Sequence, residues 1–218
     1  MPKLKKTIFN PLLERDLLYY LKLGETIKAI QLLDGGVRPI YKNDSGETPL
    51  GIAVVRGWAS MVIRLIKNGA DVHDKSIRGV TYLHVASAHG LTDMAKLLVK
   101  NGLPPKKRTD KNWTPLHIAA RYGHWELVQY YITQGVDPDV RNTDGKTALA
   151  LAHHLHHRGV VKILSPVTTV KSTSFFSKKS RKNRSKLKRR EIIYLTKSIK
   201  NDRGGIKTED SIINTAGQ

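Results

Sequence analysis

The chain has 218 residues, with 38 Lys and Arg against 18 Asp and Glu, a formal net charge of +20 and no cysteine. The basic excess favours acidic proteins, nucleic acid or an anionic membrane surface as partners, and a chain without disulfides is compatible with an intracellular protein. No apolar run approaches the roughly 20 residues of a membrane-spanning helix, and the start MPKLKKTIFNPLLERDLLYY lacks the apolar core of a signal peptide.

A period of 33 residues organises most of the sequence. Threonines recur at this interval, each followed two residues later by a leucine, and three glycine series keep the same step. These residues are Thr48, Thr81, Thr114 and Thr147; Leu50, Leu83, Leu116 and Leu149; Gly46, Gly79 and Gly145; Gly24, Gly57, Gly90 and Gly123; and Gly36, Gly69, Gly102 and Gly135. Several series in one phase predict a structural unit used about five times. Such units stack to bury their apolar faces, so function is expected on a surface.

The unit that contains Thr114 shows how each one folds. The threonine hydroxyl caps a helix, and Pro115 takes the first helical position, where a missing N–H costs nothing. Ala119 and Ala120 allow close approach of the next helix, and Gly123 ends the first helix in a left-handed turn. A second helix with an apolar face follows, so each unit is predicted to be a pair of helices.

Two segments resemble the ankyrin repeat closely: GETPLGIAVVRGWASMVIRLIKNGADV from Gly46 and NWTPLHIAARYGHWELVQYYITQGVDP from Asn112. The run Thr114, Pro115, Leu116 and His117 matches that family's helix-opening signature. The resemblance implies an all-α solenoid of stacked helix-turn-helix units joined by hairpin loops. It also assigns His84 and His117 to the repeat's own hydrogen bonding.

The phase of the repeat divides the chain. We expect an N-terminal extension over 1–11, a repeat domain over 12–165, and a basic, mostly disordered tail over 166–218. Within the domain the units are 12–43, a solvated capping repeat, then 44–76, 77–109, 110–142, and 143–165, a closing cap that has His156 where the glycine series predicts Gly. The run from Gly102 to Arg108, GLPPKKR, stiffens one connection with two prolines, so this hairpin is expected to be displaced or to serve as a binding loop.

In ankyrin proteins, partners usually meet the hairpin tips and the exposed side of the first helices. The resemblance therefore selects a partner-binding set that becomes more basic toward the C-terminal half: Arg78, His89, Arg108, Lys111, Trp113, Arg121, Tyr122, Arg141 and Lys146. The same register adds Asp44, Glu47, Val55, Arg56, Lys75, Ile77, Val80 and His154. Trp, Tyr and Arg dominate many binding energies, so the cluster around Trp113 is the preferred site; shielding of the repeat by this indole is the alternative. Trp58 and Trp125 are expected on outer surfaces.

The tail has the highest charge density. Nine of the thirteen residues from 178 to 190 are basic: Lys178, Lys179, Arg181, Lys182, Arg184, Lys186, Lys188, Arg189 and Arg190. Such a run resembles a nuclear localisation signal, and attraction to phosphates or simple solubilisation are the alternatives. Just beyond it, Leu187, Ile192, Leu195 and Ile199 suit either an amphipathic helix or a disordered stretch.

Cofactors and catalysis find little support in the sequence. His153 and His157 stand four residues apart, a spacing that suits a shared metal ion on a helix, but His157 repeats the register of His124. The chain has neither a phosphate-cradling glycine loop nor a nucleophile elbow, and the repeat accounts for its glycines. We therefore expect no metal, no cofactor and no enzymatic activity.

Three classes of function remain. The first is an adaptor or regulatory subunit, nuclear or nucleocytoplasmic with the cytoplasm as the alternative, that binds an acidic protein. It acts as a monomer or within a hetero-complex and regulates a kinase, the cell cycle or transcription. The second is a nucleic-acid or chromatin-associated factor that uses the tail for phosphate contacts. The third is a host-directed effector, since ankyrin stacks are common among these.

Overall fold

The structure is a computed structural model that describes residues 10–74 and 78–168. Ten helices and no β-strand occur in these ranges. They are α1 (Pro11–Leu23), α2 (Thr26–Asp34), α3 (Pro49–Val55), α4 (Ala59–Lys67), α5 (Tyr82–His89), α6 (Thr92–Lys100), α7 (Pro115–Tyr122), α8 (Trp125–Thr133), α9 (Ala148–His154) and α10 (Arg158–Leu164). The all-α class expected from the repeat is therefore confirmed, and no helix of the described part is long and apolar enough to cross a bilayer.

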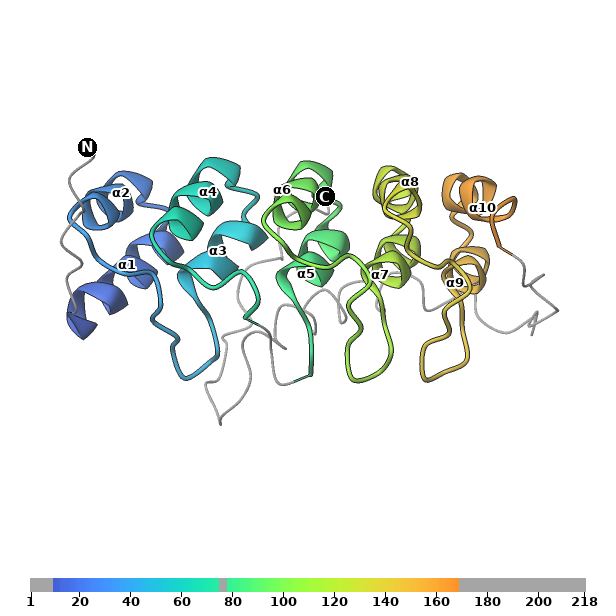
Figure 1. The fold of residues 1–218 in the computed structure, drawn as a ribbon, viewed down its shortest axis with the longest axis horizontal. Coiled ribbons are helices and arrows are strands. Elements are labelled where there is room, and N and C mark those ends of the chain that lie inside the picture. Colours follow the sequence, from blue (N-terminus) through green and yellow to red (C-terminus); the bar gives the residue numbers. More distant parts are fainter. Residues whose placement is uncertain (1–9, 75–77, 169–218) are drawn as a thin grey trace, which may run out of the picture.

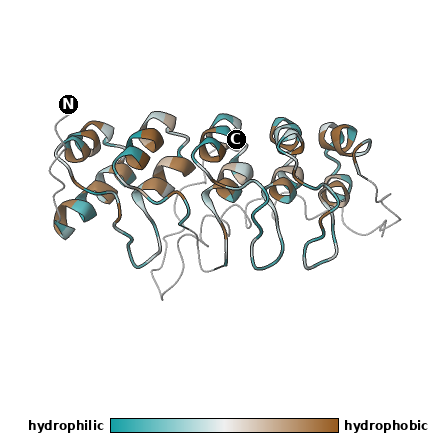
Figure 2. Ribbon diagram, in the orientation of Figure 1, coloured by the Kyte–Doolittle hydropathy of each residue, from teal (hydrophilic) through white to brown (hydrophobic). Residues whose placement is uncertain are grey.

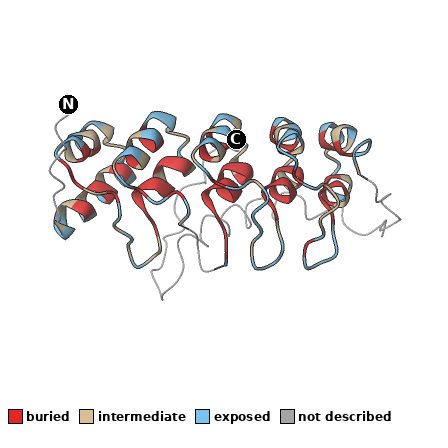
Figure 3. Ribbon diagram, in the orientation of Figure 1, coloured by how far each residue is buried: buried red, intermediate tan, exposed pale blue. Residues whose placement is uncertain are grey.

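The helices form two rows (Figure 1). The odd-numbered inner helices lie side by side in one row, the even-numbered outer helices form a second row, and the hairpins project beyond the inner row. Leu50, Leu83, Leu116 and Leu149 are at most 4% exposed, and burial concentrates where the two rows meet (Figure 3). The predicted leucine ladder is confirmed, and it joins the units into one continuous core.

The threonine series starts the inner helices as expected. Thr48 Oγ1 accepts a hydrogen bond from the Gly51 N–H at 3.0 Å, and Thr147 Oγ1 accepts one from the Ala150 N–H at 3.2 Å. Gly123 ends α7 with φ +80°, in the left-handed region that suits glycine. His156, at the same repeat position, adopts φ +58°. The exception in the glycine series therefore keeps the turn with a non-glycine residue.

Two buried histidines tie neighbouring repeats together. His84 Nε2 lies 3.0 Å from the Trp113 carbonyl oxygen of the next hairpin, and His117 Nε2 lies 3.2 Å from the Lys146 carbonyl oxygen. Burial lowers the pKa of both imidazoles to about 4, so both are neutral at pH 7. Their assignment to the repeat's own hydrogen bonding is confirmed.

A second pair of histidines links neighbouring repeats at the turns between inner and outer helices. His124 Nε2 lies 3.2 Å from the Ala88 carbonyl oxygen, and His157 Nε2 lies 2.9 Å from the Arg121 carbonyl oxygen. A Cβ on Gly123 would sit 2.6 Å from His157 Nδ1, so this glycine also makes room for the imidazole. His157 thus repeats the contact of His124, as its register indicated, and its ring packs between repeats.

The first repeat, which is expected to be a solvated cap, exposes several apolar side chains. Five of the eight large apolar side chains that are exposed in the described residues belong to it: Leu12, Tyr19, Leu23, Ile27 and Ile40. Figure 2 shows apolar segments in the helices at this end of the stack. The exposed surface of the first repeat is therefore partly apolar, and its role as a cap stays a prediction. Physically, α1 has no preceding helix pair among the described residues to cover its outward face.

The hairpin over 101–114 is not displaced, contrary to one of the two expectations for its prolines. It projects in the same direction as its neighbours (Figure 1). Leu103 is 2% exposed and fills the apolar position that Val37, Ala70 and Val136 fill in the other repeats. This anchor keeps the hairpin in register, so the prolines change the loop surface rather than its position.

Candidate functional site

The nine predicted partner-binding residues fall into two groups by exposure. The cations in the hairpins are exposed: Arg78, Arg108, Lys111, Arg141 and Lys146. The remaining four are half-buried and belong to the C-terminal ends of α5 and α7 or to the base of a hairpin: His89, Trp113, Arg121 and Tyr122. The fold therefore supplies an aromatic centre on the inner helices and an exposed cationic border on the hairpins.

Trp113 and Arg121 form the aromatic centre. These residues lie at opposite ends of α7, spaced so that they share one face of the helix with His117. The Arg121 guanidinium lies over the Trp113 indole at 5.4 Å, and the His117 ring lies 6.0 Å from the indole. Burial lowers the pKa of Arg121, and the nearby Tyr122 and Asp144 counteract it. A planar guanidinium stacks on an aromatic face in this way while its charge is retained.

Tyr122 and His89 extend this centre toward α5. The Tyr122 ring stacks on His124, with centroids 6.3 Å apart and an interplanar angle of 29°. Burial raises the pKa of Tyr122, whereas Arg121 lowers it in part. Burial also lowers the pKa of His89, helped by His124. Tyr122 and His89 are therefore neutral at pH 7, and Arg121 supplies the cation.

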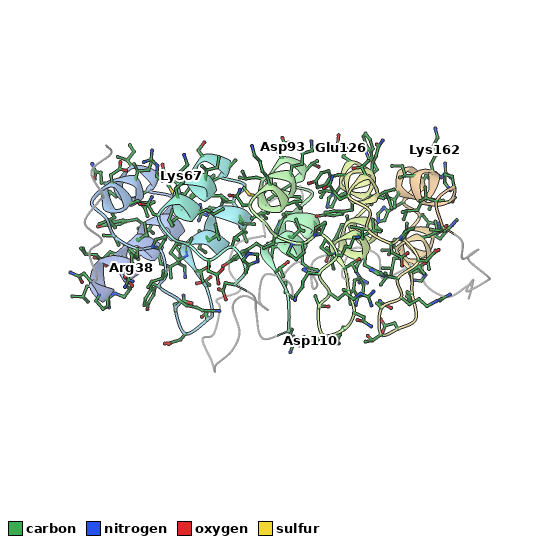
Figure 4. The ribbon with its side chains drawn as sticks, viewed as in Figure 1. Arg38, Lys67, Asp93, Asp110, Glu126 and Lys162 are labelled. Atoms are coloured by element: carbon green, nitrogen blue, oxygen red, sulfur yellow. The ribbon has the colours of Figure 1, made fainter. Side chains whose placement is uncertain are left out.

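The hairpin over 101–114, called the basic hairpin below, carries most of the border. Lys106, Lys107, Arg108 and Lys111 are all exposed in it. Its backbone is tied to both neighbours, because the Asp110 N–H donates to the Arg78 carbonyl at 3.1 Å and the Thr143 N–H donates to the Lys111 carbonyl at 3.1 Å. Figure 4 shows Asp110 among the hairpin tips, well away from Lys67, Asp93, Glu126 and Lys162 on the outer helices. A fixed backbone thus presents long cationic side chains.

The next hairpin continues the border with Arg141 and Lys146. The Arg141 guanidinium donates to the Gly145 carbonyl of its own turn at 2.7 Å, which holds the end of this side chain over the loop. The buried Asn142 accepts hydrogen bonds from the Asp144 and Lys146 N–H groups at 3.0 and 2.9 Å. This turn is therefore ordered by its own side chains while both cations stay exposed.

Two residues that the register placed on the binding face are buried instead. Glu47 and Val80 are 3% and 5% exposed. Glu47 accepts hydrogen bonds from the Lys22 ammonium and the Asn43 amide, both at 2.8 Å. Both residues directly precede a capping threonine, but Lys146 holds the same repeat position and is exposed, so burial at this position depends on the side chain and its partners. The expectation that Glu47 and Val80 are exposed on the binding face is therefore wrong.

The other register-selected residues divide between exposed positions, half-buried positions and segments outside the described ranges. Asp44, Arg56 and His154 are exposed, and Val55 is half-buried. Lys75, Ile77 and the nine tail residues Lys178, Lys179, Arg181, Lys182, Arg184, Lys186, Lys188, Arg189 and Arg190 lie outside the described residues. As expected, Trp125 is on the outer surface, where it is 51% exposed. Trp58 is half-buried beneath Arg56, whose guanidinium lies 5.0 Å from the ring.

The partner-binding set predicted from the sequence omits Lys106 and Lys107, although both belong to the run GLPPKKR. It also missed Asp144, which is close enough to raise the pKa of Arg121. No group of three His, Cys, Asp or Glu side chains in the described residues is arranged to hold a metal ion. The arrangement of cations around an aromatic centre is suited to binding anionic groups.

Comparison with known families agrees with the helix pairs. Residues 17–109 match a family model described as ankyrin repeats (3 copies), and residues 107–152 match one described as ankyrin repeats (many copies). No curated protein matches the chain.

Proposed function

Because this chain belongs to the ankyrin-repeat family, whose repeats generally mediate protein–protein interaction, we propose that it is a non-enzymatic adaptor or regulatory subunit for an acidic protein. The proposed contact surface consists of the basic hairpin, the hairpin that carries Arg141 and Lys146, and the Trp113–Arg121 stack. The observation that carries this proposal is the exposed cationic border around a half-buried Arg–Trp pair. Binding regulates the partner by occlusion, without chemistry.

The chemistry of the centre supports this choice of partner. Trp, Tyr and Arg are enriched among the residues that dominate binding energy, particularly where surrounding side chains exclude water. Arg121 meets that description, because the Trp113 ring covers one side of its guanidinium. An acidic side chain bound there gains a charge-assisted hydrogen bond at a partly desolvated position, and the exposed hairpin cations speed the encounter.

The proposal extends to the nucleus through the tail. The run over 178–190, with nine basic residues among thirteen, supports import, and a kinase, cell-cycle or transcription target is then accessible. Deletion of residues 171–218 should reduce nuclear enrichment of a fluorescent fusion while its circular dichroism stays helical. Enrichment that persists after this deletion contradicts the nuclear part of the proposal.

The binding part is tested by affinity purification and mass spectrometry. Replacing Trp113, Arg121 and Tyr122 together by Ala should remove specific co-purifying proteins, whereas Trp125→Ala on the outer surface should retain them. Thermal unfolding of both variants checks that the stack is intact. An unchanged set of proteins from the triple variant rules out this surface.

The composition of the tail favours one second candidate, a nucleic-acid-associated factor. Its affinity for duplex DNA should then fall steeply between 50 and 200 mM salt, since each neutralised phosphate adds about 0.9 to the slope. Weak salt dependence, or no binding at all, removes this alternative and leaves the adaptor.

A further inference from the structure

The hairpin between α8 and α9, residues 134–147, repeats the turn of the hairpin over 35–48. In each turn an asparagine side chain accepts the N–H of the residue four positions later, at 2.8 Å for Asn43 and 2.9 Å for Asn142. The N–H of each asparagine donates to the carbonyl of that later residue, at 3.1 and 3.0 Å. The later residue is Glu47 in one hairpin and Lys146 in the other. Because the same bonds hold both asparagines, their amide nitrogens point the same way from their turns.

The two amide nitrogens nevertheless differ in what they meet. Asn43 Nδ2 donates to Glu47 Oε2 at 2.8 Å, and the Lys22 ammonium donates to the same oxygen at 2.8 Å. Asn142 is only 4% exposed, yet its Nδ2 has no hydrogen-bond partner among the residues that the structure describes. A buried amide donor without an acceptor is unfavourable, and native proteins satisfy nearly all such groups. The turn at Asn142 therefore indicates an acceptor from outside the chain.

The cation that accompanies the amide recurs as well. Arg121 stands at the repeat position of Lys22, three repeats later. Burial lowers the pKa of Arg121, and the groups that raise it include Asp144, so this guanidinium is within electrostatic reach of the hairpin over 134–147. In the basic hairpin the two corresponding positions hold Thr109 and Ala88, which offer neither an amide nor a cation. An amide with a cation is thus a feature of particular repeats.

Building on the adaptor function proposed above, we propose that Asn142 and Arg121 form a subsite for one carboxylate of the acidic partner. Asn142 donates to this carboxylate through Nδ2 and Arg121 supplies the cation, as Asn43 and Lys22 do for Glu47. Hydrogen bonds that involve an ionised group are shorter and stronger than neutral ones. Lys146 stands in place of that glutamate and is exposed, so the partner supplies the acid that the chain lacks there.

Lys146→Glu tests the subsite without a partner, because it supplies the carboxylate from the chain itself. We expect it to raise the melting temperature of the full-length protein by about 3 °C. The same substitution in an Asn142→Thr background should raise it by less than about 1 °C. Thr is a matched replacement, since Thr109 at this repeat position accepts the Trp113 N–H at 3.1 Å and so keeps the turn. Equal rises in both backgrounds reflect net charge alone and overturn the proposal.

Binding of a ten-residue polyglutamate peptide tests the subsite in its proposed role. Asn142→Thr keeps the net charge and should weaken binding by about tenfold, because one charge-assisted hydrogen bond is lost. Asn43→Thr is the control, since its amide is already bound to Glu47. It should lower the melting temperature and leave affinity unchanged. Isothermal titration calorimetry measures both variants, and unchanged affinity in Asn142→Thr overturns the subsite.

The triple variant Trp113→Ala, Arg121→Ala and Tyr122→Ala separates this inference from the function on which it rests. If the triple variant loses the peptide and Asn142→Thr keeps it, the carboxylate subsite is wrong and the adaptor surface stands. If neither variant changes affinity, the proposed contact surface is wrong and the subsite fails with it. Loss of affinity in both, with Asn43→Thr unaffected, supports the subsite.

Discussion

The hairpin between α2 and α3, residues 35–48, and the basic hairpin occupy equivalent places in the stack, yet they use their charges in different ways. In the first, Lys42 pairs with Asp74 at 3.1 Å, Arg38 lies 3.6 Å from Glu14, and Glu47 is buried. In the basic hairpin, Arg108 stands at the position of Lys42 but forms no ion pair within the described residues. Lys42 and Arg108 are both exposed, so the two hairpins differ in whether this cation is paired with an acid.

Repeat register explains this difference. The position of Asp74 is taken by Lys107 in the next repeat and by Val140 in the one after, so the acid that neutralises Lys42 has no equivalent near Arg108. Both hairpins keep the same backbone role, since each ends at a threonine that caps an inner helix. One scaffold position therefore stabilises the fold in one repeat and is available for binding in another.

The largest predicted effect is a loss of affinity for the partner, which charge reversal should cause in the basic hairpin only. Charge reversal by Arg108→Glu with Lys111→Glu should weaken binding of a co-purified acidic partner by about 100-fold, or about 2.7 kcal/mol. Lys42→Glu, at the repeat position of Arg108, should leave affinity nearly unchanged, since Lys42 is already paired. Isothermal titration calorimetry measures both, and equal losses from the two hairpins contradict the assignment.

The next largest effect concerns pH, because acid should destabilise one half of the stack more than the other. The pKa of folded His84 and His117 is about 4 against 6.5 for an ordinary His, so the unfolded chain takes up protons first as pH falls. Their stabilising contribution is present above about pH 6.5 and is lost as pH falls toward 4. Each histidine should lower the free energy of unfolding by about 2 kcal/mol between pH 7 and pH 5.

Hydrogen exchange locates this acid effect. The amides of α5 and α7, which hold His84 and His117, should lose protection first, whereas α1 to α4 contain no histidine. In a His84→Gln variant the stability should depend less on pH. A uniform loss of protection along the stack excludes these two histidines as the cause.

Removal of Glu47 tests whether the charged residues of the hairpin over 35–48 stabilise the fold. Glu47→Ala deletes a buried acceptor of two side-chain hydrogen bonds and should lower the free energy of unfolding by about 2 kcal/mol. Lys146→Ala, at the same repeat position in the last hairpin, should change stability by less than about 0.5 kcal/mol, because that side chain is exposed. Urea unfolding measures the stability of both variants. Equal destabilisation means that the repeat position, rather than the burial of the side chain, determines the contribution to stability.

The smallest effect concerns two Arg–Trp pairs. Arg56 stacks on Trp58 at 5.0 Å and Arg121 stacks on Trp113 at 5.4 Å, so Arg56→Ala and Arg121→Ala should each cost about 0.5–1 kcal/mol of stability. Affinity for the partner should fall only for Arg121→Ala. Loss of affinity in both variants indicates a general loss of structure, which thermal unfolding identifies.

The features that could be predicted from the sequence are those that recur. The 33-residue step located the capping threonines, the leucine ladder and the roles of His84 and His117, because each is repeated in one phase. The burial of Glu47 could not be read in this way. It depends on Lys22, 25 residues away in the preceding repeat, and on the position of this residue at the base of its hairpin.

The candidate site could be predicted from the sequence only in part. The resemblance to ankyrin repeats placed Trp113 and Arg121 in one cluster, but their stacking depends on a side chain that reaches back along the length of α7. The exposed apolar face of α1 has no sequence signal of its own, since the position of Tyr19 is half-buried in α3 and buried in α5, α7 and α9. Burial there depends on the neighbouring repeat, which a local pattern does not contain.

The central claim is that the basic hairpin, rather than its equivalent at residues 35–48, contacts the partner. Hydrogen exchange of the full chain, with and without a ten-residue polyglutamate peptide as an acidic probe, tests it most directly. The account predicts new protection over 101–114 and 134–147 and none over 35–48. Protection of residues 35–48 to the same degree, or protection confined to the tail, contradicts it.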